Sequence, residues 1–85
     1  MVRSIWYIEW EAGEDPDLGE CWILARREWP GRGAAALMCD EATIEQIRRA
    51  PSLRVVRLPR DGETFVDLSG RAVVIEAGGM AWRQL

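Results

Sequence analysis

Residues 33–56 read GAAALMCDEATIEQIRRAPSLRVV, and this stretch decides the fold. It begins with a short apolar run from Gly33 to Cys39. The alanines in this run favour a helix, but a short apolar run bounded by glycine is also typical of a buried strand. We expect a strand, because the turn-forming pair Pro30 and Gly31 would return the chain alongside the strand before it.

A short helix over residues 40–50 is expected to follow this strand. Asp40 is a favourable N-cap residue, because its side chain can accept a hydrogen bond from a free backbone N–H of the first turn. Ile44 and Ile47 lie three residues apart and therefore share one face of the helix. Pro51 ends the helix, because the residue before a proline disfavours the helical conformation.

The sequence on both sides of this unit predicts further strands. They are rich in β-branched and aromatic residues and are separated by turn-forming residues, and they cover 2–10, 21–29, 53–58, 63–68 and 71–77. We expect the first two to pair as an antiparallel hairpin. Residues 1–85 are therefore predicted to form a single small α+β domain, mainly an antiparallel sheet of five to six strands with one short helix packed on one face.

The order of strand, helix, proline and strand in residues 33–56 resembles one stretch of the subtilisin-propeptide-type inhibitor domains. The resemblance covers about a quarter of the chain. Such a domain has a helix after its first strand, and the first half of this sequence lacks one. The resemblance therefore implies this local arrangement and nothing more.

Missing residue types argue against most catalytic chemistry. The chain has no His, and all eleven basic residues are Arg. Imidazole is the usual general base at neutral pH, and Lys is the usual amine nucleophile. Two Cys without a His are too few for a four-ligand zinc site. We expect no catalytic residues, no metal site and no cofactor, and thus not an enzyme.

Charge and cysteine usage suggest where the protein works. The longest stretch without a charged residue, 33–39, has seven residues, so no membrane span or export signal is expected. Arg in place of Lys, with abundant Ala and Gly, is typical of GC-rich bacteria and their phages. We expect a cytoplasmic protein of a bacterial host cell.

A register centred on the Pro30 turn would place Cys21 opposite Cys39, as two reduced, largely buried neighbouring thiols.

An acidic cluster is the main candidate for a binding site. Six carboxylates and no basic residue lie between positions 9 and 20. A cluster of one sign on a loop can steer a protein onto a basic surface. The predicted partner-binding residues are Glu9, Trp10, Glu11, Glu14, Asp15, Asp17 and Glu20. We expect this connection to be mobile and unpaired with Arg; the alternative is a solvated loop that only keeps the protein soluble.

Five Trp in 85 residues would supply much of a small core. If one of them is exposed for binding, we expect it to be Trp10 or Trp82, because both lie beside predicted loops or in the tail. Exposed Trp is enriched at the centres of protein interfaces.

The leading hypothesis is a non-catalytic protein-binding module that docks its acidic surface on a basic, nucleic-acid-binding partner. In size, acidity and lack of catalytic side chains it is similar to phage-encoded inhibitors such as anti-CRISPR proteins. The alternative is a small structural or virion subunit that self-associates. A third hypothesis is a weak nucleic-acid binder through the Arg cluster Arg48–Arg60. Direct nucleic-acid binding is not expected, because the pI is about 4.9 and no aromatic residue lies within this cluster.

Overall fold

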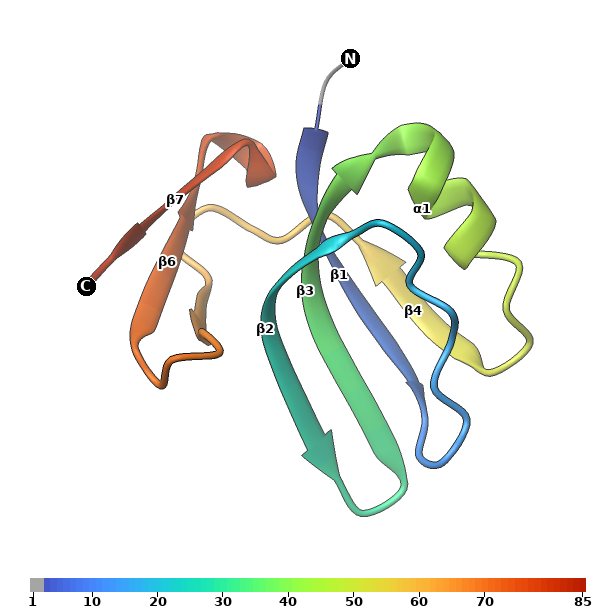
Figure 1. Ribbon diagram of the computed structural model, residues 1–85. Coiled ribbons are helices and arrows are strands. Elements are labelled where there is room, and N and C mark those ends of the chain that lie inside the picture. Colours follow the sequence, from blue (N-terminus) through green and yellow to red (C-terminus); the bar gives the residue numbers. More distant parts are fainter. Residues whose placement is uncertain (1–2) are drawn as a thin grey trace.

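β1 (Arg3–Glu11) is an inner strand of a four-stranded antiparallel sheet in the computed structural model, which describes residues 3–85 (Figure 1). The order of the strands is β2-β3-β1-β4. The other three strands of this sheet are β2 (Trp22–Trp29), β3 (Arg32–Asp40) and β4 (Leu53–Arg57). Every pairing in the sheet is antiparallel.

A second antiparallel sheet is built from the C-terminal third of the chain. Its order is β5-β6-β7, with β5 (Thr64–Val66), β6 (Ala72–Glu76) and β7 (Ala81–Gln84). The predicted α+β class, with mainly antiparallel strands and one short helix, is therefore confirmed. The number of strands is seven, close to the five to six expected, and they are divided between two sheets.

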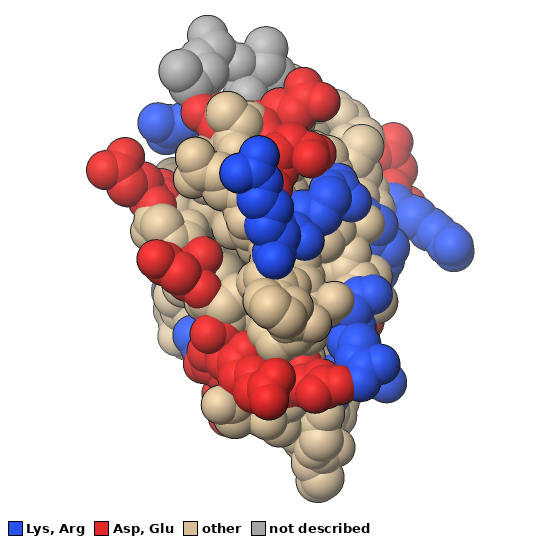
Figure 2. Space-filling view, turned by 90° about the vertical axis from the view of Figure 1, so that its right-hand side faces the viewer, with Lys and Arg blue, Asp and Glu red and all other residues tan. Residues whose placement is uncertain are grey.

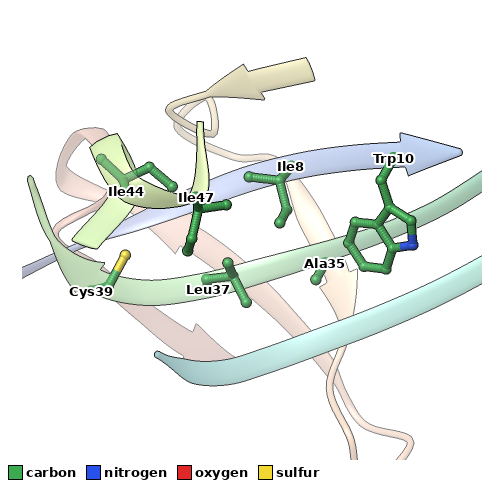
Figure 3. Packing of buried hydrophobic residues seen from close by; sticks show 7 residues of the cluster. All are labelled: Ile8, Trp10, Ala35, Leu37, Cys39, Ile44 and Ile47. Atoms are coloured by element: carbon green, nitrogen blue, oxygen red, sulfur yellow. The ribbon is translucent and has the colours of Figure 1, made fainter. Parts of the chain in front are cut away.

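Helix α1 (Glu41–Ile47) covers one face of the four-stranded sheet. The side chain of Asp40 accepts a hydrogen bond of 2.8 Å from the backbone N–H of Thr43, which confirms the predicted N-cap. Figure 3 shows that the two buried isoleucines of the helix point down onto the sheet, where they pack with Ile8 and Leu37. The elements β3, α1 and β4 thus follow one another along the chain as residues 33–56 predict.

The predicted hairpin between the first two strands is wrong. β2 pairs with β3, and β3 lies between β2 and β1. The reason is the composition of β3: its residues Ala34–Leu37 are all buried, so both faces of the strand must be covered and both edges paired. The segment 12–21 therefore crosses the helix-side face of the sheet, where Leu18 and Cys21 pack against the core.

The strands predicted at 53–58, 63–68 and 71–77 do not belong to a single sheet. β4 pairs with β1 at the edge of the first sheet, whereas β5 and β6 belong to the second. The tail around Trp82, for which no strand is predicted, forms strand β7 and pairs with β6. Between β6 and β7 lies a tight turn, Ala77–Gly79, in which all three residues have positive φ. Gly79 has a φ of +92° and approaches the backbone of Ile5 closely, so glycine is required here for both conformation and space.

A β-bulge at Leu24 sets the position of the two cysteines. Near the turn Trp29 pairs with Arg32, but beyond the bulge the register shifts by one residue. This shift brings Cys21 opposite Cys39; the register of the turn alone would place their side chains on opposite faces. The two thiols are free and adjacent, and burial raises the pKa of each. The predicted adjacency is confirmed, but only Cys39 is buried, whereas the sequence predicts two largely buried thiols.

Candidate functional site

The six carboxylates of the predicted acidic surface do not act as one group. Three of them are ion-paired with Arg side chains of the same chain: Glu9 with Arg32 at 2.9 Å, Glu11 with Arg54, and Asp15 with Arg26. The expectation of a loop free of such pairs is therefore wrong for these three. The pairs form because β1 and the segment after it lie beside Arg-bearing strands that are distant in sequence.

The other three predicted carboxylates remain available to a partner. Glu14, Asp17 and Glu20 are exposed, and none of them forms an ion pair with the residues that the structure describes. The Asp17 carboxylate accepts a hydrogen bond of 2.9 Å from the backbone N–H of Gly19, which holds a local turn. Segment 12–21 thus keeps three solvated carboxylates on a connection that is fixed at several points.

Trp10 is not the exposed aromatic residue that the sequence predicts. Its side chain is 1% exposed and lies in the helix-side core (Figure 3). Strand parity explains this, because Trp10 shares a face with Ile8, and its ring covers the Cα of Gly33 so closely that a Cβ there would lie 2.5 Å from Nε1. The indole N–H donates to Asp15 Oδ1 at 3.0 Å. Trp10 therefore anchors the segment after β1 and is not available to a partner.

The exposed tryptophan is Trp22, with 59% of its surface accessible. Its ring meets Trp82 in an edge-to-face arrangement, with centroids 5.8 Å apart and planes at 89°. Trp82, the other predicted candidate, is partly buried against the second core cluster. Sequence reasoning misses Trp22 because its position at the start of β2 carries no signal of exposure.

The face of the four-stranded sheet opposite the helix is only half covered. The second sheet packs on one half of it, where Ile75 of β6 is buried against Ile5 and Ala36. The other half forms an open groove of about 560 Å³ that is bordered by β5, and we call it the inter-sheet groove. Its floor is made by Ala34 and Ala36, which are themselves buried.

The walls of the inter-sheet groove are aromatic. Tyr7 and Phe65 stack with ring centroids 5.8 Å apart, and Trp29 lines the groove as well. The Tyr7 hydroxyl donates to Glu9 at 2.7 Å. Burial, and then this hydrogen bond to a carboxylate, raise the pKa of Tyr7 to about 12, so the phenol stays protonated at neutral pH. The groove therefore presents large rings at its walls, whereas the methyl groups of Ala34 and Ala36 beneath it are only 1% exposed.

Two guanidinium groups in the groove have different partners. Arg57 forms two hydrogen bonds to Glu63, at 2.9 and 2.7 Å, and lies 4.4 Å over the Tyr7 ring. Arg57 lowers the pKa of the Glu63 carboxyl through these hydrogen bonds, and Glu63 raises the pKa of Arg57. Arg27 lies 4.3 Å over the Trp29 ring and has no ion pair within residues 3–85. Arg26, which also lines the groove, is paired with Asp15, so Arg27 is the unpaired cation among the described lining residues.

The Arg48–Arg60 cluster does not form a continuous basic patch. Three of its members are ion-paired: Arg48 with Glu45 at 3.3 Å, Arg54 with Glu11, and Arg57 with Glu63. Figure 2 shows both signs of charge intermixed on the face that it presents. Phosphate binding needs several uncompensated cations on one surface, which this cluster lacks among the described residues.

The inter-sheet groove and its free Arg27 are the features that sequence reasoning misses altogether. The alanines of β3 are visible in the sequence, but they read as core. Whether they end up under a second sheet or on the floor of a groove depends on where β5 and β6 pack, which no local pattern encodes.

Comparison with known proteins gives no family: no family model, no curated protein and no solved structure matches the chain. Across residues 3–85 no three His, Cys, Asp or Glu side chains are grouped so that they could hold a metal ion. The one α-helix of the described chain is too short to cross a membrane.

Proposed function

We propose that this protein is a non-catalytic protein-binding module that takes a segment of its partner into the inter-sheet groove. One observation carries the proposal: an open groove with aromatic walls lies over the half of the sheet face that the second sheet does not cover. Concave surfaces with apolar lining and a few fixed polar groups are where proteins bind their ligands. Aromatic residues and Arg also dominate the energetics of protein interfaces.

The acidic docking surface is a second candidate for the same function. It is supported by three exposed carboxylates, Glu14, Asp17 and Glu20, which have no Arg partner among residues 3–85. In this form the protein would act as a phage-type inhibitor that covers a basic, nucleic-acid-binding surface. The surface is smaller than the sequence suggests, because Glu9, Glu11 and Asp15 are neutralised and Trp10 is buried.

Self-association by edge strands has less support. One edge strand of the first sheet, β2, contains a bulge and the consecutive charged residues Arg26, Arg27 and Glu28. Bulges and charges are the devices by which natural sheets avoid pairing edge to edge. A concentration-independent monomeric mass in light scattering is therefore the expected result.

A pull-down with tagged protein at low and high salt distinguishes which of the two surfaces binds the partner. A partner held in the groove is retained by the wild type and lost with Trp29→Ala. The same partner is retained by the loop variant Glu14→Arg/Asp17→Arg/Glu20→Arg and by Trp22→Ala, which removes an exposed ring outside the groove. Loss with the loop variant alone, together with release at high salt, would instead support acidic docking. Thermal unfolding of every variant shows whether it is folded.

A further inference from the structure

The free guanidinium of Arg27 is fixed in the wall of the inter-sheet groove. Its stacking on Trp29, at 4.3 Å, sets the position of the guanidinium group without consuming its N–H donors. The other Arg side chains beside it are occupied, since Arg26 pairs with Asp15 and Arg57 pairs with Glu63. Within residues 3–85 no carboxylate takes up Arg27. The groove therefore offers an oriented cation whose natural complement is a carboxylate.

Beside this cation the groove offers room for a large side chain above Ala34, which is itself only 1% exposed. Ala34 is opposite Arg27 in the β2–β3 register, so the cation and the floor are neighbours on one face of the sheet. The rings of Phe65 and Tyr7 border the same floor. A ligand that combines a carboxylate with an adjacent aromatic or large aliphatic group would satisfy both features.

The backbone of β5 favours a peptide as the source of that ligand. Ile75 donates to the carbonyl of Glu63, and Asp67 donates to that of Arg71, so the hydrogen-bonded positions facing β6 are the odd ones. The backbone groups of Thr64 and Val66 consequently face away from β6, and both residues line the groove. Such an edge can bind an extended chain.

A nucleic acid fits the same groove less well. Single-stranded nucleic acids bind to aromatic rings along a groove with several cations that follow the phosphates. Here Arg57 is neutralised by Glu63, Arg32 by Glu9, and the whole chain has a net charge of −3.

We propose that the inter-sheet groove binds an extended acidic segment of a partner protein. A carboxylate of the segment pairs with Arg27, and a neighbouring aromatic or large aliphatic side chain lies against the rings of Tyr7 and Phe65. This inference rests on the proposed function of the groove and adds the chemistry of the segment that it binds.

The test is selection of a displayed library of random twelve-residue peptides on the full-length protein. Peptides selected by the wild type are expected to carry Asp or Glu next to an aromatic or large aliphatic residue. Arg27→Glu should weaken their binding about tenfold or more, because hydrogen bonds to charged groups are among the stronger ones. Arg49→Glu is the matched control, since Arg49 is an exposed Arg outside the groove, and should bind like the wild type. Phe65→Ala, which removes a ring from the wall of the groove, should also weaken binding.

Each other outcome contradicts the acidic-segment inference, alone or together with the proposed function of the groove. Peptides without acidic residues that still lose affinity in Trp29→Ala would overturn the acidic-segment inference and leave the groove as the binding site. Peptides whose binding is unaffected by Trp29→Ala would overturn both. Tighter binding of an oligothymidylate than of any selected peptide, lost in Arg27→Glu, would show a nucleic-acid site. The unfolding temperature of each variant must be measured, so that loss of fold is not read as loss of binding.

Discussion

The two faces of the four-stranded sheet are covered to different extents. On one face, α1 and the segment 12–21 pack over the sheet, and Ile8, Leu37 and Ile44 are fully buried. On the other face, the second sheet covers one half and leaves the inter-sheet groove over the other. Substitutions on the helix side should therefore act on stability, whereas substitutions in the groove should act on binding. The comparison makes quantitative predictions.

The largest effect is expected for Ile44→Ala on the helix side. Truncation of a fully buried aliphatic side chain costs about 2–5 kcal/mol of unfolding free energy, from lost transfer energy and the cavity that remains. The matched truncation Val66→Ala lies at the groove, where 60% of the side chain is exposed, and should cost less than about 0.5 kcal/mol. Chemical denaturation measures both. Equal losses would remove the distinction between the two faces.

Gly33→Ala is expected to cost about 1–3 kcal/mol, because the added methyl group overlaps the Trp10 ring. The cost should be smaller in a Trp10→Phe background, since the smaller ring lacks the indole nitrogen nearest to the new methyl group. A double-mutant cycle by denaturation gives this coupling. Additive effects of the two substitutions on the free energy of unfolding would show that the Trp10 ring does not contact a methyl group at position 33.

Asp15→Ala tests whether the segment after β1 is anchored. The substitution removes the acceptor of the buried Trp10 indole N–H and should cost about 1–2 kcal/mol. Glu14→Ala, at an exposed neighbouring carboxylate without an ion pair in the described chain, serves as the control and should change stability by less than about 0.5 kcal/mol. Identical unfolding curves for the two variants would mean that the segment is not fixed by this contact.

The smallest effect concerns the ion pair at the groove wall. Arg57 lowers the pKa of Glu63 in the folded state, so the ionised carboxylate stabilises the fold at pH above the unfolded pKa of about 4.3. This stabilisation is lost as the pH falls through the lower folded pKa. Glu63→Gln should therefore melt at a slightly lower temperature than the wild type at pH 7, and the difference should shrink in acid. A difference that grows in acid would contradict this role.

Local structure is the part of this molecule that the sequence predicts well. The N-cap at Asp40, the strand at 33–39 and the face of Ile44 and Ile47 follow from capping, periodicity and turn chemistry. The adjacency of Cys21 and Cys39 is also predicted, although it depends on a β-bulge that no sequence pattern indicates. All of these features involve residues that are close in sequence or joined by one tight turn.

The features that depend on distant contacts are not predicted. The place of β1 between β3 and β4, the burial of Trp10 and the neutralisation of Asp15 all arise when segments far apart in the chain pack together. Charge counting treats Glu9 and Glu20 alike, whereas strand pairing gives only the first an Arg neighbour among the described residues. The candidate site shifts from the loop to the groove for the same reason.

The order β2-β3-β1-β4 has a consequence for the path of folding. β1 is made first by the ribosome, yet its partners β3 and β4 emerge only after the intervening segments have been synthesised. β2 and β3 are joined by a two-residue turn at Pro30-Gly31, and such hairpins form within about 1–10 μs. Pairings between distant segments form more slowly, because the chain between them must first be ordered. We therefore expect β2 and β3 to form the folding nucleus. β1, although it is synthesised before them, is expected to pair with β3 in a later step.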